Sequence, residues 1–168
     1  MAISMHSASV PIFVRMLGNM TTWLDKAEAH ASAKKFEPQV YLQARLAPDM
    51  LPFVNQIQIA CDAAKGAAAR LAGVAIPAFE DDEKTIADLK ARIDKTVAFL
   101  RTMKAEQIDG SEEKDLVIKV GGNDTHTKGM SFLLGRSIPN FYFHVTTAYD
   151  ILRQAGLELG KLDYLGRT

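Results

Sequence analysis

Apolar residues recur at steps of three and four along four long segments of the chain, a spacing that places them on one face of a helix. We therefore expect helices over about residues 9–33, 50–72 and 84–103, and a fourth that begins at Ser131 or Pro139 and ends near Ala155. Gly73 and Gly156 follow the second and fourth of these segments, and a glycine is a common residue after the last turn of a helix.

A different pattern separates the third and fourth segments. "DLVIKV" alternates apolar and polar residues, "GGND" supplies turn residues and "THTKGM" returns, so residues 115–130 predict a small β-hairpin. The leucines of the tail, residues 157–168, indicate that it docks on the helices. Together these patterns predict an all-α fold, a four-helix bundle with a hairpin between its third and fourth helices, as a single domain over residues 1–168.

Charge and composition narrow the classes of function. Lys plus Arg and Asp plus Glu each number 20, and no cluster of four or more cations occurs, which argues against a nucleic-acid binder. No apolar run approaches the ~18 residues of a membrane span, and no helix has a cationic polar face for a membrane surface. The single cysteine, Cys61, allows no internal disulfide, and no signal peptide is evident, so we expect a cytoplasmic protein. Cys61 falls in the apolar stripe and is expected to be a buried, inert thiol.

His144, in "NFYFHVTTAYDILRQAG", is the main candidate for chemistry. It lies about 60° from the centre of the fourth helix's apolar stripe, so it faces the interior or its edge. It is either a ligand or general base, or a structural histidine bonded to a neighbour, and lone histidines near cores are more often structural. Position 148, one turn later, is alanine, and Asn140, one turn earlier, is a poor transition-metal ligand.

Asn140, Asp49, Gln58 and Tyr149 complete the candidate pocket around His144. Asp49, in "LAPDMLP", is most simply the N-cap of the second helix. Gln58 points away from the apolar stripe of that helix, which predicts a solvated face. Tyr149 lies on the shoulder of the fourth helix, and Phe143 lies opposite its core face. Because exposed aromatic residues usually find a partner, we expect a homodimer built partly on the fourth helix, unless the hairpin or tail covers Phe143.

The stretches "SVPIFVRMLGNM", "LAPDMLPFVNQIQIACDAAKGAAARLAG" and "IPNFYFHVTTAYDILR" carry a family resemblance over essentially the whole chain. The sequence resembles an uncharacterised bacterial branch of the DinB/YfiT-like four-helix bundles, a metalloenzyme superfamily. In that superfamily one histidine of the second helix and a His-x-x-x-His pair of the fourth hold the metal. His144 matches the first of the pair, and the second falls on Ala148. The second-helix histidine falls on Gln58 or near Asp49.

Two hypotheses follow from this resemblance. In the first, which we favour, the metal site is degenerate and the protein binds a small molecule or has a structural role. In the second, the protein is a metal-dependent enzyme of thiol transferase or hydrolase type, with a remodelled site formed by His144, Asp49 and Asn140. A divalent metal, Zn or Ni, would then be held with His144 as its histidine ligand, but no cofactor is firmly implied.

Overall fold

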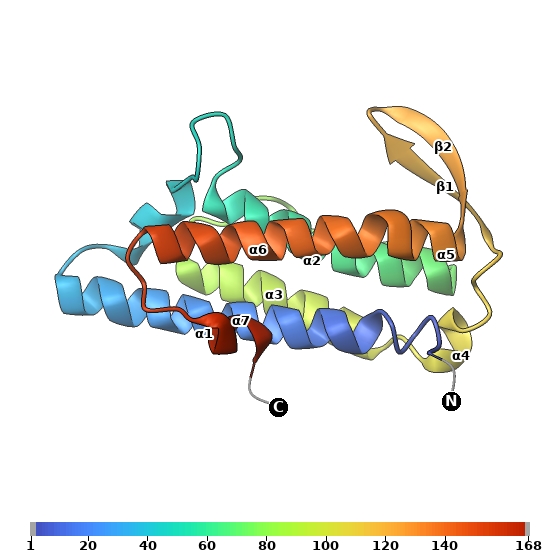
Figure 1. Ribbon diagram of the computed structural model, residues 1–168, viewed down its shortest axis with the longest axis horizontal. Helices are drawn as coiled ribbons and strands as arrows, with labels where there is room; N and C mark the ends of the chain where they lie inside the picture. Colours follow the sequence, from blue (N-terminus) through green and yellow to red (C-terminus); the bar gives the residue numbers. More distant parts are fainter. Residues whose placement is uncertain (1–2, 167–168) are drawn as a thin grey trace.

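The computed structural model describes residues 3–166, and four long helices dominate it (Figure 1). These are α1 (Val10–Lys34), α2 (Phe53–Ala72), α3 (Ile86–Arg101) and α6 (Ile138–Gln154). The shorter elements are the α-helices α4 (Ala105–Ile108), α5 (Gly129–Phe132) and α7 (Lys161–Leu165), the 3₁₀-helix η1 (Pro38–Gln43), the π-helix η2 (Leu133–Ser137) and the strands β1 (Asp115–Val120) and β2 (Asn123–Lys128). The prediction of a helical fold with one small hairpin is confirmed, but the described residues form seven α-helices rather than four.

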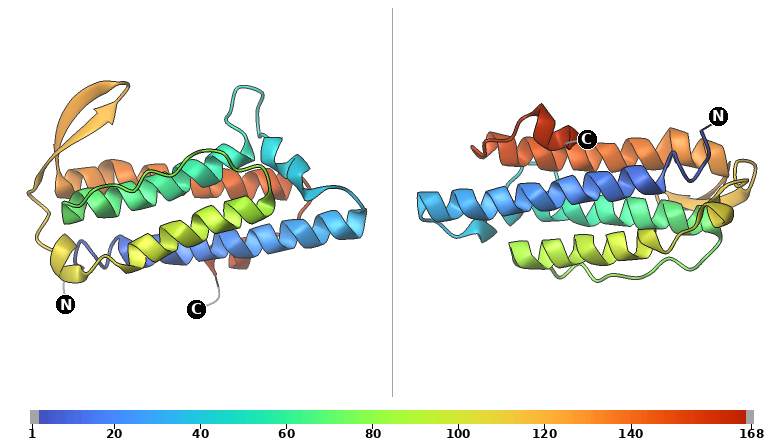
Figure 2. Two further views of the ribbon diagram at one scale, coloured as in Figure 1. Left: turned by 180° about the vertical axis from the view of Figure 1, so that it is seen from behind. Right: turned by 90° about the horizontal axis from the view of Figure 1, so that it is seen from below.

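The long helices do not alternate in direction along the chain. Figure 1 shows α2 and α3 running in one direction and α1 and α6 in the other. Because α2 and α3 are parallel, the segment 73–85 must run back along the whole of α2, a helix about 30 Å long at 1.5 Å per residue. Figure 2 shows this crossover segment lying along the outside of the helices.

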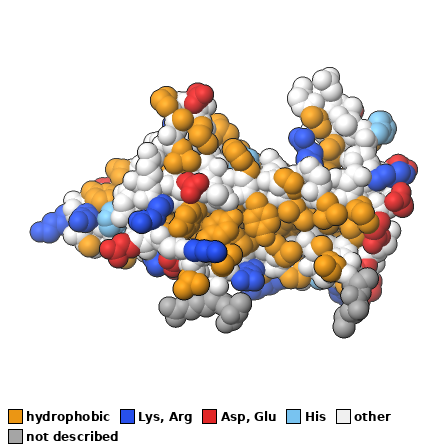
Figure 3. All heavy atoms as spheres, viewed as in Figure 1, with side chains coloured by type: hydrophobic (Ala, Val, Ile, Leu, Met, Phe, Trp, Pro, Cys, Tyr) orange, Lys and Arg blue, Asp and Glu red, His pale blue; other side chains and the backbone are white. Residues whose placement is uncertain are grey.

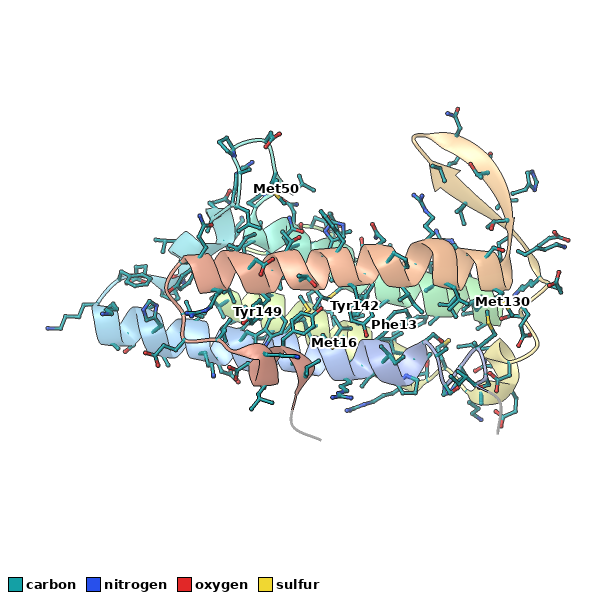
Figure 4. All side chains as sticks on the ribbon, in the orientation of Figure 1. Phe13, Met16, Met50, Met130, Tyr142 and Tyr149 are labelled. Carbon is teal, nitrogen blue, oxygen red and sulfur yellow. The ribbon has the colours of Figure 1, made fainter. Side chains whose placement is uncertain are left out.

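Small residues allow α2 to lie close to its neighbours. Ala60, Ala64, Ala67 and Ala68 are fully buried, and α2 packs most extensively against α6 and α3. On the opposite side of α6, apolar and aromatic side chains fill the seam with α1. Figure 4 shows Phe13, Met16, Tyr142 and Tyr149 lying together along this seam.

The start of α2 departs from the sequence prediction, and Asp49 is not its N-cap. The helix begins at Phe53, with Pro52 in an extended conformation at the N-cap position. Asp49 lies exposed in a turn of the preceding loop. That loop is closed without it, because the Phe53 amide donates to the carbonyl of Ala44 and the Arg45 guanidinium donates to that of Met50.

The fourth predicted helix begins earlier than either expected start. Helical structure runs without a break from Gly129 through α5, η2 and α6. Pro139 has no amide hydrogen to donate to the preceding turn, and the wider π-helical turn over Leu133–Ser137 lies directly before it. The proline is thus accommodated inside a longer helix rather than starting one.

The tail docks on the helices, as its leucines predict. Leu157 and Leu159 are buried, and the Trp23 indole donates to the carbonyl of Asp163 at 2.9 Å. The ring of Tyr164 stacks on Trp23 at 5.8 Å between centroids. Leu162 and Leu165 are exceptions, because both are exposed.

Candidate functional site

His144 on α6 and Gln56 in the first turn of α2 meet across the α2–α6 seam. His144 is 9% exposed, and its Nδ1 lies 2.7 Å from Oε1 of Gln56, which is itself buried. The Gln56 amide is in turn oriented by the backbone, because its Nε2 donates to the carbonyl of Leu51 at 2.8 Å. A chain of three groups therefore joins α6, α2 and the loop before α2.

This chain of hydrogen bonds determines the tautomer of His144. The Leu51 carbonyl can only accept, so the amide NH₂ of Gln56 must face it and Oε1 must face the imidazole. Oε1 is also only an acceptor, so Nδ1 of His144 carries the proton. Nε2 is then the basic nitrogen, and no described residue bonds to it.

Burial keeps the imidazole neutral. Loss of solvation lowers the pKa of His144 below the usual 6.5, and no described carboxylate opposes the effect. A neutral ring with a fixed Nδ1–H and a free Nε2 can accept one hydrogen bond or donate one lone pair to a metal.

The side chains around His144 do not fit a metal centre of the superfamily type. A stable zinc site needs at least three good protein ligands. Ala148, where the second histidine of the pair would stand, is fully buried. Gln56, the α2 residue facing His144, offers an amide already bonded on both sides. Across residues 3–166 no group of three or more His, Cys, Asp or Glu side chains is placed to hold a metal ion.

The structure separates the other candidate residues. Asp49 is exposed and has no hydrogen bond to His144 among the described residues. Tyr149 faces α7, where its ring meets Tyr164 at 5.6 Å and its hydroxyl donates to the carbonyl of Leu159. Asn140 lies on the same helix as His144, one turn earlier, and lines a separate cavity at the hairpin.

The expectation that Gln58 faces solvent is wrong. Gln58 is only 3% exposed, because the crossover segment covers this side of α2. Its Nε2 donates to Glu83 of that segment at 2.7 Å, and its Oε1 accepts from Asn55. Periodicity along α2 could not reveal a covering segment that has no regular structure of its own.

Two further predictions about single side chains are confirmed. Cys61 is fully buried, and burial raises its pKa to about 12, so the thiol is inert at neutral pH. Phe143 is 57% exposed, and neither the hairpin nor the described part of the tail covers it.

Comparisons with known proteins establish the family. A family model described as a domain of unknown function, DUF1993, matches residues 5–165. The chain belongs to this family. A DinB family member protein from Shewanella denitrificans, with a crystal structure at 1.83 Å resolution, is 38% identical to this DUF1993 chain. The two structures share a TM-score of 0.89 over 97% of this chain and 92% of that one. No curated protein matches the sequence significantly.

The DUF1993 chain therefore has the DinB-like fold that its motifs implied. Within residues 3–166, no helix has the length and apolar character needed to cross a membrane. Sequence reasoning missed Gln56 as the partner of His144. Gln56 lies two residues before Gln58, so it is turned by 200° on the helix wheel and faces α6, whereas Gln58 faces the crossover segment.

Proposed function

We propose that the superfamily metal centre is degenerate in this DUF1993 protein, and that the protein binds a small molecule rather than catalysing a metal-dependent reaction. The proposal rests on the series of hydrogen bonds from His144 through Gln56 to Leu51, and on Ala148, which lies one turn after His144 on α6. It presents one free nitrogen in a seam where a metal would need three ligands.

In this proposal His144 is a recognition group. Its tautomer is held by Gln56, so Nε2 offers a hydrogen-bond acceptor of fixed direction at the edge of the buried seam. Because the ring is nearly buried, a ligand hydroxyl or amide that reaches Nε2 would bond in a poorly solvated environment, where such bonds are stronger than in water.

Metal analysis tests this proposal. Protein purified without a histidine tag should hold only trace zinc, nickel or iron, and the His144→Ala variant should hold no less. The variant should lose about 1–3 kcal/mol of stability, since Gln56 Oε1 is left buried without its donor. His126→Ala, which removes a histidine from the exposed hairpin, is the matched control.

Stoichiometric metal that is retained by His126→Ala and lost from His144→Ala would overturn the proposal. The metal-dependent enzyme with a remodelled site at His144 would then be the correct account, and Asp49→Asn would show whether that loop supplies a ligand.

We also propose that the protein is a cytoplasmic homodimer, with Phe143 in the interface. Figure 3 shows hydrophobic side chains gathered in a band along the face formed by α1 and α6, and Phe143 adds a large exposed ring on α6.

Light scattering should give about twice the chain mass of 18.4 kDa. Phe143→Arg should give the single mass, and Val117→Arg, at an exposed position of the hairpin, should not. A wild-type monomer at micromolar concentration would exclude the dimer.

A further inference from the structure

A cavity of about 160 Å³ lies where the hairpin meets the helical body, apart from the His144–Gln56 pair. Four regions of the chain form its walls: the last turns of α2, strand β1, α5 with η2, and the first turn of α6. Figure 1 shows the hairpin rising over this end of α6, and Figure 3 shows a Lys or Arg side chain in the notch beneath it. Its polar lining consists of Arg70, Lys119, Arg136, Ser137 and Asn140.

The charge of the lining is of one sign. Arg70, Lys119 and Arg136 are cations, and no described acidic residue lines the cavity. Lys119 pairs with the Asp124 carboxylate at 2.8 Å in an exposed ion pair on the hairpin. Such exposed pairs contribute little and exchange readily, so they do not neutralise the cavity.

Arg70 is the cation most in need of a counter-charge. It is half-buried, and its guanidinium bonds only to the carbonyl of Gly66 and lies 5.8 Å from the ring centroid of Phe132. No carboxylate among the described residues lies within ion-pair distance of it. Desolvation lowers its pKa, which shows that the positive charge is poorly compensated.

Ser137 and Asn140 add neutral donors to the same wall. Ser137 is 5% exposed, and it lines the cavity. A serine hydroxyl can both donate and accept, so at this wall it can donate a hydrogen bond to an anion that enters. Arg136 and Asn140 are one turn apart, which places their side chains on the same side of the helix as this cavity.

The backbone at this position is also unusual. Arg136 and Ser137 belong to the π-helix η2, and π-helical turns are rare and frequently occur at functional sites. The wider turn changes the angular position of each following side chain, so that Arg136, Ser137 and Asn140 all reach one cavity.

The size of the cavity limits what it can hold. Its volume of about 160 Å³ is below the 300–1,000 Å³ of pockets that enclose a whole drug-sized ligand. The charged end of a ligand fits inside, and the remainder would extend into solvent.

We infer that Arg70, Arg136, Lys119, Ser137 and Asn140 form an anion-binding site for the phosphoryl group of a small soluble phosphomonoester. Two guanidinium groups match phosphate oxygens with paired N–H donors, and the hydroxyl and amide supply directed bonds. This site is independent of the proposed loss of the metal centre, since it shares no residue with the His144–Gln56 pair.

Binding to glycerol 3-phosphate and to inorganic phosphate tests the inference, with glycerol as the uncharged control. Titration followed by two-dimensional amide NMR and calorimetry should show saturable binding, with shifts concentrated at Ser137, Asn140 and β1. Arg136→Gln should weaken the affinity about tenfold or more, and Ser137→Ala should weaken it several-fold, from the loss of one charged and one neutral hydrogen bond. Arg136 is exposed, so its replacement should not disturb folding.

Arg101→Gln is the matched control, because it removes the same charge from the exposed last turn of α3. Tighter binding of glycerol 3-phosphate than of inorganic phosphate identifies a phosphomonoester as the ligand. Equal weakening by Arg101→Gln and Arg136→Gln, shifts elsewhere on the chain, or no saturation would overturn the inference. Preferential binding of a single-stranded oligonucleotide would overturn it as well. None of these outcomes bears on the metal content, so the two proposals can fail separately.

Discussion

Replacing Arg92 with leucine should lower the free energy of unfolding by about 3–5 kcal/mol, the cost of removing one partner from a buried ion pair. Arg92 lies on α3 with only 2% of its side chain exposed, and it bonds to Glu83, whose side chain is 6% exposed, at 2.9 Å. It also contacts Asp62 on α2 and Asp81 of the crossover segment, each at 2.9 Å. The leucine variant leaves the Glu83 carboxylate buried with no cation beside it in place of Arg92, and with Gln58 and the Glu83 backbone amide as its donors.

The pH dependence of this loss separates charge from packing. Burial by itself raises the pKa of Glu83, but hydrogen bonds from Gln58 and Arg92 outweigh it and hold the pKa below the usual 4.5. A carboxyl with a lowered pKa stabilises the fold above its unfolded-state pKa, and the contribution disappears as the pH falls through the folded-state pKa. In Arg92→Leu, protonation of Glu83 at low pH removes the buried charge that has lost its arginine partner.

The difference between wild type and Arg92→Leu in urea unfolding should therefore be largest near neutral pH and should shrink below about pH 4.5. Lys128→Leu is the control, because it breaks an exposed pair with Asp115 and should change stability little. A difference that stays constant with pH would mean that lost packing of the arginine side chain, and not the buried charge, causes the effect.

Gly129→Ala should be the other severe substitution, with a loss of about 3 kcal/mol or more from overpacking against the backbone. A Cβ atom at this position would lie 1.9 Å from the carbonyl oxygen of Ser111. The approach is this close because the Gly129 amide donates to the carbonyl of Lys114 and the Met130 amide to that of Glu112. These two bonds hold the base of the hairpin against the start of α5, so the backbone cannot shift without releasing it.

Gly18→Ala provides the opposite expectation within the same chain. Gly18 is an exposed residue in the middle of α1, and a Cβ there meets nothing within 4 Å. Alanine should stabilise the protein by about 0.5–1 kcal/mol through its higher helix propensity. Chemical denaturation should show a lower free energy of unfolding for Gly129→Ala and a higher one for Gly18→Ala. Equal changes in stability for Gly129→Ala and Gly18→Ala would show that the backbone around the Ser111 carbonyl moves away from the added Cβ without cost.

The periodic parts of the fold could be predicted from the sequence. The apolar stripes of α1, α2 and α3 predicted these helices to within a few residues. The hairpin strands pair from Asp115 with Lys128 to Val120 with Asn123, inside the predicted range. These features depend on residues close in sequence, which a local pattern records.

The parts that could not be predicted depend on residues far apart in the chain. The partner of His144 is 88 residues away, and the cations of the hairpin cavity come from three separate elements. The ion pairs of Arg92 depend on a crossover segment without periodicity, so Gln58 was assigned to solvent. The turn at Asp49 resembled a helix cap because the extended conformation of Pro52, which delays α2, is set by the loop as a whole.

The parallel course of α2 and α3 has a kinetic consequence. In an up-and-down bundle each helix first meets its sequence neighbour through a short loop, and such local contacts favour fast folding. Here α2 packs most extensively on α6 and on α3, and α3 is reached only after residues 73–85 have turned back. Closing these long loops costs conformational entropy before the stabilising contacts form. The protein should therefore fold more slowly than an up-and-down bundle of the same length. The Arg92 ion pairs would then form late, and would act mainly on the rate of unfolding.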